Sequence, residues 1–172
     1  DVADFYQTQS LDYVKSGFDI TIPAPNTADV TIYALVKGMK RSIFKIDMQG
    51  NLEIFVDVVA FPSPPQFLND LEADAEGNLY VSDSGDLKGT GGAIYKISPQ
   101  GKVTVVASGK QEPRVKAPNG LLMGKTSNCI WMVDFNSGIL YRIDMKKNTI
   151  IEVAKGFGGG DGLVKVGKDQ LY

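Results

Sequence analysis

The chain has 172 residues, a formal net charge of −2, and 43% hydrophobic against 22% charged residues. This composition is typical of a soluble globular domain with a sizeable core, and the scattered Lys and Arg residues argue against a nucleic-acid binder. No apolar run approaches the ~20 residues of a membrane-spanning helix, so no membrane span is expected. Residues 1–10 lack the pattern of a signal peptide, but a signal removed earlier would leave none, so cytoplasmic and exported locations both stay open.

Histidine is absent, and Cys129 is the one cysteine. These counts exclude a Ser-His-Asp or Cys-His mechanism, an intrachain disulfide, and a zinc site built from His or several Cys side chains. A metal ion would therefore be held by oxygen atoms, which favours calcium or magnesium. Cys129 lies in the apolar stretch NCIWMVD, which predicts a buried strand and an inert thiol.

In chain order, residues 1–28 predict an irregular segment with a weak helical signal at 2–17, and 29–38 predict a strand. Two families of β segments then alternate. Each segment of the first family contains an apolar residue, an aromatic residue, a basic residue and Ile, followed by a turn and a second run of alternating apolar residues. This pattern predicts hairpins at 43–57, 94–108 and 140–154. The other opens with Asn or Asp and continues with an apolar run, a polar turn and a second strand at 69–83, 119–134 and 161–172.

The first family recurs after 51 and 46 residues and the second after 50 and 42, so one repeat contains four short strands. Such a repeat is typical of a β-propeller blade. We expect an all-β fold in which residues 1–172 form a single partial propeller of three to three and a half blades. The blade repeats are expected at about 29–57, 69–108, 119–154 and 161–172.

The last predicted blade stops at Tyr172, inside its second strand. An unpaired strand at that point would leave half of a hydrophobic face uncovered. We therefore expect the chain to be a fragment, or part of a longer or multi-chain assembly. A small β-sandwich is the alternative fold.

Each repeat of the second family begins with a side chain that carries an oxygen: Asn69, Asn119 and Asp161. Equivalent positions of successive blades lie around the propeller axis at one height, so these oxygens are expected to converge in the central channel. Amide and carboxylate oxygens suit a hard cation such as calcium. Taken alone, each residue is better explained as a turn former, but three in register favour the metal-facing interpretation.

Two glycine-containing stretches predict loops near the channel. Residues 156–162, GFGGGDG, predict a loop with close backbone approach at the channel mouth, and residues 82–92 predict a long exposed loop that alternatively shapes the substrate pocket. Asp83 and Asp134 end equivalent strands and predict turns at the blade corners. Recurring aromatic residues predict packing between sheets: Tyr80, Tyr95, Trp131 and Tyr141.

The segments FLNDLEADAEGNLYVSDSG, APNGLLMG followed by ILYRID, and GGGDGLVKVGKDQLY resemble the gluconolactonase/regucalcin (senescence marker protein) family of six-bladed β-propellers. The resemblance runs from about residue 30 to the C-terminus and implies a divalent cation, usually calcium, in the channel. It implies that Asn119 and Asp161 are metal ligands, that Asn69 faces the substrate or the metal, and that Asp161 is the general base or nucleophile. The implied activity is hydrolysis of a lactone or related ester.

The sequence departs from the family pattern at one ligand. The family's first-blade Glu normally stands in an EGP segment, which is absent here, and Asp19 is a weak substitute for it. Catalysis by this chain alone is therefore left undecided, and a non-catalytic propeller that binds a small ligand or a protein partner is the alternative. The remaining blades are expected from the same chain or from another chain.

Overall fold

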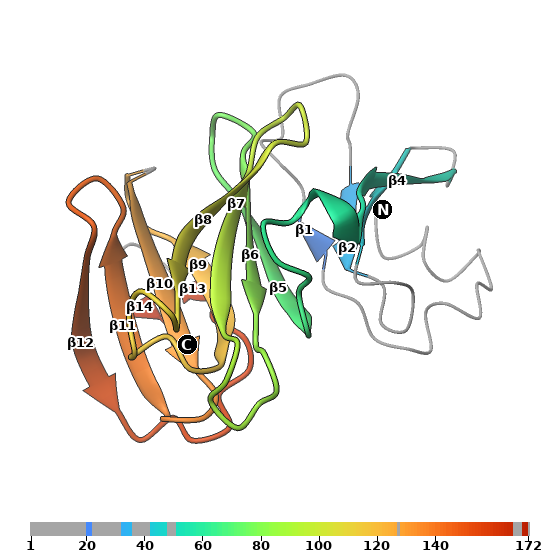
Figure 1. The fold of residues 1–172 in the computed structure, drawn as a ribbon. Helices are drawn as coiled ribbons and strands as arrows, with labels where there is room; N and C mark the ends of the chain where they lie inside the picture. The colour runs from blue at the N-terminus through green and yellow to red at the C-terminus, as the bar shows by residue number, and fades with distance from the viewer. Residues whose placement is uncertain are drawn as a thin grey trace.

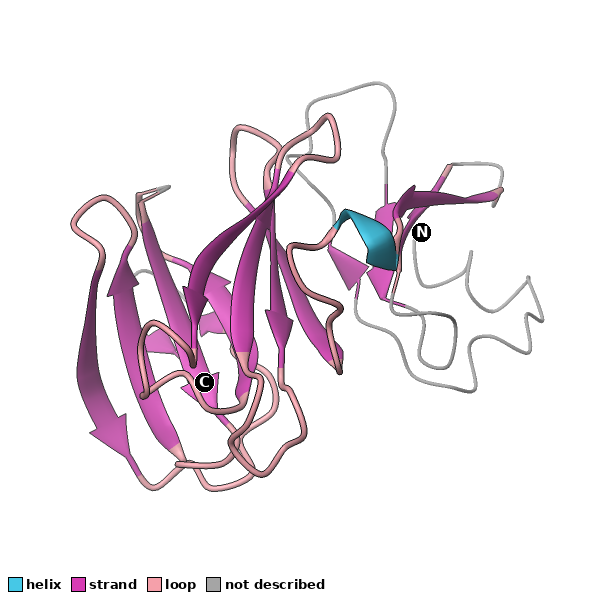
Figure 2. Cartoon of the chain, in the orientation of Figure 1, coloured by secondary structure: helices cyan, strands magenta, loops and turns pink. Residues whose placement is uncertain are grey.

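The computed structural model describes residues 20–21, 32–35, 42–47, 51–126, 128–166 and 170–171. Within these ranges the regular structure is antiparallel β-sheet, apart from one turn of 3-10 helix, η2, at Val58–Ala60. Figures 1 and 2 show the sheets standing beside one another. The predicted helical signal at 2–17 and the candidate ligand Asp19 lie outside the described residues. No helix in the described part of the chain is long and apolar enough to cross a membrane.

Three four-stranded sheets follow one another along the chain, and each is called a blade. Blade 1 contains β1 (Ile20–Thr21), β2 (Ile32–Leu35), β3 (Ile43–Ile46) and β4 (Leu52–Val56). Blade 2 contains β5 (Leu68–Ala73), β6 (Leu79–Asp83), β7 (Ala93–Ile97) and β8 (Val103–Ser108). Blade 3 contains β9 (Pro118–Met123), β10 (Cys129–Asp134), β11 (Ile139–Asp144) and β12 (Thr149–Lys155). A further pair contains β13 (Lys165–Val166) and β14 (Gln170–Leu171).

In each blade the strands pair in chain order, which is the arrangement of a β-propeller blade. The hairpins predicted at 43–57, 94–108 and 140–154 are confirmed as β3–β4, β7–β8 and β11–β12. Short polar side chains close their turns: Asp47 accepts hydrogen bonds from the amide and side chain of Asn51. The predicted all-β fold of propeller blades is therefore confirmed, and the chain contains part of a propeller.

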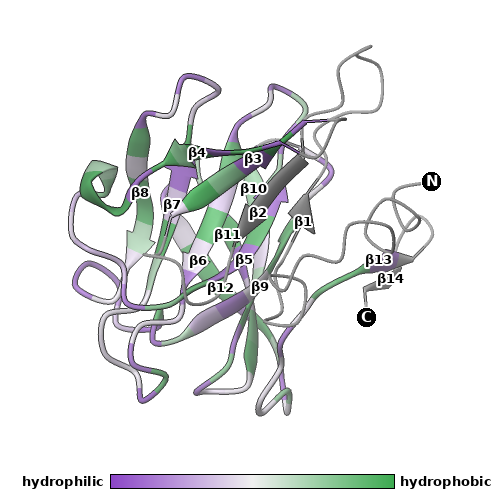
Figure 3. Ribbon diagram, turned by 90° about the vertical axis from the view of Figure 1, so that its right-hand side faces the viewer, coloured by the Kyte–Doolittle hydropathy of each residue, from purple (hydrophilic) through white to green (hydrophobic). Residues whose placement is uncertain are grey.

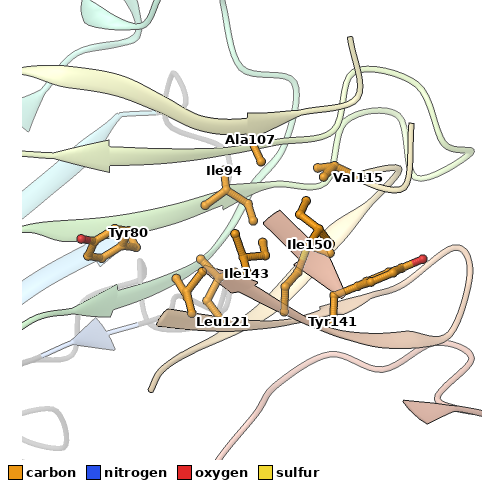
Figure 4. Close-up of a cluster of buried hydrophobic side chains, with 10 residues drawn as sticks. Tyr80, Ile94, Ala107, Val115, Leu121, Tyr141, Ile143 and Ile150 are labelled. Carbon is orange, nitrogen blue, oxygen red and sulfur yellow. The ribbon is translucent and has the colours of Figure 1, made fainter. Parts of the chain in front are cut away.

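Alternate side chains of a blade pack against its two neighbours. In β6, Leu79 and Val81 belong to the apolar cluster shared with blade 1, whereas Tyr80 belongs to the cluster shared with blade 3. Figure 4 shows the second cluster, where Tyr80 and Ile94 of blade 2 lie with Ile143 and other side chains of blade 3. Figure 3 shows apolar residues along the strands of the stacked sheets. Because successive side chains of a strand point to opposite faces, each blade packs apolar side chains against both of its neighbours.

The aromatic residues follow the prediction of packing between sheets with one exception. Tyr95 is buried between blades 1 and 2, and Tyr80 and Tyr141 are buried between blades 2 and 3. Trp131 is only half-buried. Cys129, predicted to be buried, is also half-buried, and partial burial raises the pKa of its thiol.

The first strands of blades 2 and 3, β5 and β9, contact each other. Carboxylates of β5 reach the edge of β9 that does not pair with β10: Asp70 accepts a hydrogen bond from the amide of Leu121, and Glu72 accepts one from the amide of Met123 at 3.3 Å. These bonds satisfy amides that β10 on the other side of β9 does not reach. They fix the two blades against each other at the strands that carry the predicted site.

Candidate functional site

The predicted site residues lie at one end of blades 2 and 3. Asn69 is the second residue of β5, and Asn119 is the second residue of β9. Asp161 lies in the loop between β12 and β13. The two asparagines therefore occupy equivalent positions in neighbouring strands, as the repeat predicted.

Asn119 has an unusual environment. Its side chain is 2% exposed, and its Oδ1 atom is buried without a hydrogen-bond partner. Among the described residues it is the one buried side-chain nitrogen or oxygen in that condition. Leaving such an atom unpaired costs about 1–3 kcal/mol, so an additional donor or a cation at Oδ1 would recover free energy.

The backbone of Asp161 packs against β9 at the same end of the molecule. A Cβ atom built on Gly120 would lie 2.4 Å from the carbonyl oxygen of Asp161, so the residue next to Asn119 must be glycine for the loop to pass. The predicted close backbone approach of the 156–162 loop is confirmed at this contact. The side chain of Asp161 is exposed. The tertiary structure therefore brings the backbone of Asp161, in the loop after β12, against Gly120, the residue that follows Asn119 in β9.

Asn69 is tied into the protein more firmly than Asn119. Its Nδ2 atom donates to the Oγ of Ser84 at 3.1 Å, and this hydroxyl donates to the carbonyl oxygen of Pro118 at 2.8 Å. Because Pro118 precedes Asn119, the chain of hydrogen bonds joins the two predicted site residues. Asn69 keeps its carbonyl oxygen Oδ1 as the acceptor that it can offer to a ligand.

Asp134 holds the strand that carries Asn119. Its buried carboxylate accepts hydrogen bonds from the amides of Lys116 and Ala117 at 3.0 and 2.7 Å. It also accepts from the amide and hydroxyl of Ser137, at 2.8 and 2.9 Å. The predicted turn at this corner is confirmed by the bonds to Ser137. The reach back to the residues before β9 was not predicted.

Asp83 does the same for the strand that carries Asn69. Its carboxylate is 1% exposed and accepts from the amides of Gln66, Phe67 and Gly85. Both aspartates thus position a site asparagine from the neighbouring strand. In the sequence, Asp83 and Asp134 end equivalent strands, and this pattern predicted a turn at each residue. It did not predict that their carboxylates bind the amides before β5 and β9.

The loop after β6 also lies at this end. The side chain of Asn136 donates to the carbonyl oxygen of Leu87 at 3.4 Å, and a Cβ atom on Gly89 would lie 3.6 Å from the Cβ of Lys116. The loop of blade 2 therefore rests on blade 3 beside the segment that leads to Asn119. Most of residues 86–91 are exposed, as predicted for this loop, and its alternative role in shaping a substrate pocket stays a prediction.

Oxygen donors at this end suit a hard cation. The three predicted residues offer two amide oxygens and one carboxylate, and the buried Oδ1 of Asn119 lacks a partner. Within the described ranges, no three His, Cys, Asp or Glu side chains gather into a group that could hold a metal. The donor chemistry therefore fits calcium better than a transition metal, and a complete ligand set needs oxygens beyond these three.

Residues 7–163 match the family model described as SMP-30/gluconolactonase/LRE-like region. No curated protein matches the sequence. Among solved structures, a chain of a nidogen/laminin complex is 18% identical with a TM-score of 0.65, and the match covers 83% of this chain and 50% of that chain.

Regucalcin from Agrobacterium tumefaciens is 20% identical with a TM-score of 0.58, covering 83% of this chain and 48% of that chain. A gluconolactonase from Xanthomonas campestris is 15% identical with a TM-score of 0.57, covering 77% and 48%. The chain spans about half the length of each of these three solved chains. At these identities the structures support the fold, while the family model covers most of the sequence. The chain belongs to the SMP-30/gluconolactonase/LRE-like family.

Proposed function

We propose that this chain forms part of a calcium-dependent hydrolase that opens a lactone or a related ester in the central channel of the propeller. The observation that carries the proposal is the buried Oδ1 atom of Asn119, which has no hydrogen-bond partner in the described part of the chain. The next residue, Gly120, packs against the backbone of Asp161, whose carboxylate adds a negative charge to the neutral amides. A cation is the simplest group that satisfies both atoms.

Asn119 and Asp161 would hold the cation, and Asn69 would offer its Oδ1 either to the cation or to the substrate. A bound calcium or other divalent ion would supply a Lewis acid that polarises the carbonyl of the substrate. Asp161 is exposed, so a water molecule or a substrate can reach its carboxylate. Asn69, held through Ser84, would orient the substrate without moving.

Asp161 is the proposed catalytic residue. As a general base, its carboxylate takes a proton from the attacking water while the water oxygen bonds to the carbonyl carbon. The ring C–O bond then breaks, and the proton passes to the departing oxygen to give a hydroxy acid. Direct attack by the carboxylate, followed by hydrolysis of the resulting anhydride, is the alternative route for the same residue.

Two relatives support the choice of chemistry. The structure from Agrobacterium tumefaciens is described as that of a calcium-binding protein, and the one from Xanthomonas campestris as that of a gluconolactonase. Both share the fold with this chain at low identity. They support the proposal as relatives, and the residues above specify it for this sequence.

The test is to replace Asn119 by Ala and Asp161 by Asn in the full-length protein and to measure calcium affinity by calorimetry and lactone hydrolysis by acid release. Each replacement is expected to weaken calcium binding about 10-fold or more, because one oxygen ligand or one ligand charge is lost. Asn148→Gly is the matched control, since Asn148 lies in the β11–β12 turn at the opposite end of blade 3. Unchanged affinity and hydrolysis in both variants would contradict the assignment. Calcium binding without hydrolysis of any lactone or ester would instead favour the non-catalytic binding propeller.

A further inference from the structure

Three exposed apolar side chains lie on loops at the end of the molecule where Asn119 lies. They are Leu87 in the β6–β7 loop, Phe135 after β10 and Phe157 after β12. Their exposed fractions are 38%, 36% and 45%. We call these three side chains the apolar rim. In Figure 1 their loops lie together at the lower end of blades 2 and 3.

Backbone contacts join the three loops into one surface. The amide of Phe157 donates to the carbonyl oxygen of Gly138 at 2.9 Å, and a Cβ atom on Gly138 would lie 2.6 Å from the amide nitrogen of Gly158. The Leu87 loop is joined to the same turn through Asn136. The apolar rim is therefore built across two blades and not from one mobile loop.

The apolar rim is continuous with the candidate site. The amide of Phe135 donates to the carbonyl oxygen of Ala117 at 2.9 Å, two residues before Asn119. The β6–β7 loop begins at Ser84, which binds both Asn69 and Pro118. The apolar rim and Asn119 therefore lie at the same end of blades 2 and 3 and are joined through the segment before β9.

Leu87 adds a second and independent observation. Its φ angle is +60°, in the left-handed region that a bulky residue avoids and that glycine or asparagine accepts. The carboxylate of Asp86 holds the loop in this shape by accepting hydrogen bonds from the amides of Lys88 and Thr90 at 2.8 and 2.9 Å. The backbone of Leu87 is bonded to Ser84 and Asn136, but its side chain is exposed despite the strained φ angle. Strain of this kind is typical of ligand-contact positions.

We propose that the apolar rim binds an alkyl or aryl group of the substrate, so that the preferred lactone or ester carries such a group instead of hydroxyl groups alone. The inference rests on the proposed function and specifies its substrate class. Small-molecule sites usually contain a few polar groups that orient the ligand, surrounded by apolar side chains. Here Asn119 and Asp161 are the polar centre.

The experiment uses γ-lactones whose alkyl tail lengthens from methyl to octyl, with glucono-1,5-lactone as the hydroxylated comparison. In the full-length protein, kcat/KM is expected to rise up to about fourfold for each of the first few methylene groups, which is the effect of burying one CH₂ group. In Phe135→Ala and Phe157→Ala, the increase in kcat/KM for each added methylene is expected to become smaller or to disappear. Val105→Ala is the matched control, because Val105 is 39% exposed but lies in the outer strand β8. Its slope is expected to match the wild type.

Leu87→Gly separates ligand contact from stability. Glycine suits the positive φ angle, so the melting temperature is expected to stay equal or to rise, while the dependence of kcat/KM on tail length falls. If the slope in Leu87→Gly equals that of the wild type, the assignment of Leu87 to the apolar rim is wrong.

The outcomes for the apolar rim and for the proposed function are distinguishable. Hydrolysis at rates independent of tail length, or a preference for glucono-1,5-lactone, would overturn the apolar rim and leave the hydrolase proposal standing. If no lactone or ester is opened, the hydrolase proposal fails, and γ-lactams with the same tails test the apolar rim by calorimetry. Affinity that rises with tail length and is lost in Phe135→Ala supports it, and affinity without this dependence overturns it.

Discussion

Blades 2 and 3 use one repeat position in two ways. Asn69 and Asn119 both stand second in the first strand of their blade, and a buried aspartate from the next strand holds the segment before each of them. The blades differ at the residue after that aspartate. In blade 2 it is Ser84, which is buried and receives the amide of Asn69. In blade 3 it is Phe135, whose ring is partly exposed.

The difference teaches how a repeat acquires a site. Both blades have the same scaffold, because the same strands and the same aspartate are needed to fold each one. A serine at one position ties the asparagine of blade 2 to its neighbour. A phenylalanine at the equivalent position of blade 3 offers no such hydroxyl, so blade 3 has no counterpart of the bond between Ser84 and the Asn69 side-chain amide. Asn119 also differs from Asn69 in burial, because its Oδ1 atom is buried and has no hydrogen-bond partner among the described residues. Of the two blades, blade 3 is therefore the one whose asparagine keeps a buried unpaired oxygen.

Removing the shared aspartate is expected to have the largest effect on folding. Asp134→Ala leaves four donor groups without their acceptor, and the free energy of unfolding is expected to fall by about 3–5 kcal/mol in urea denaturation. Asp83→Ala, with donors from Gln66, Phe67 and Gly85, is expected to cost a similar or slightly smaller amount.

The control for this pair is Asp144→Ala, since Asp144 binds two turn amides and the exposed ammonium group of Lys147 near the surface. It is expected to cost less than about 1 kcal/mol. If Asp134→Ala or Asp83→Ala costs no more than this control, the two aspartates do not hold the blades in the way described.

The serine that distinguishes blade 2 is expected to have an intermediate effect. Ser84→Ala removes the partner of Asn69 Nδ2 and of the Pro118 carbonyl, which is expected to cost about 1–2 kcal/mol of unfolding free energy. Thr104→Ala is the comparison, because the Thr104 hydroxyl donates to the carbonyl of Lys96 at an exposed position, and its loss is expected to cost under about 0.5 kcal/mol. Equal costs would show that the buried bond between the blades has no special weight.

The smallest expected effect concerns the loop between the second and third strands, β6 and β7, of blade 2. This loop is longer than the equivalent loop of blade 3. Amides of Thr90 and Lys88 bind the carboxylate of Asp86 and lower its pKa below the ordinary value of an aspartate. Because the folded pKa is depressed, the contribution of Asp86 to loop order is present above the unfolded value of about 4 and is lost as the pH falls through the folded value.

Amide hydrogen exchange and carboxyl chemical shifts measured by NMR would check this. The Asp86 carboxyl is expected to titrate below an ordinary aspartate, and the amides of Lys88 and Thr90 are expected to lose protection as it is protonated. Asp86→Ala should remove that protection at neutral pH as well. An ordinary titration of Asp86, with protection unchanged, would contradict the prediction.

Much of the fold could be predicted from the sequence because it depends on local patterns. The turn between β3 and β4 is closed by Asp47 and Asn51, four residues apart, and the strands alternate with a period of two. The repeat of about 50 residues then gives four strands per blade. Cys129 and Trp131 departed from expectation, because an apolar strand indicates burial without specifying which neighbour covers each face.

The candidate site could be predicted only in part from such local patterns. The sequence by itself determined that Asn69, Asn119 and Asp161 recur in register, since that is a matter of spacing along the chain. The tertiary structure decided that Asn69 is tied to Ser84 while Asn119 keeps a buried unpaired oxygen. That outcome depends on atoms brought together from different strands and blades, and spacing carries no information about which of those atoms meet.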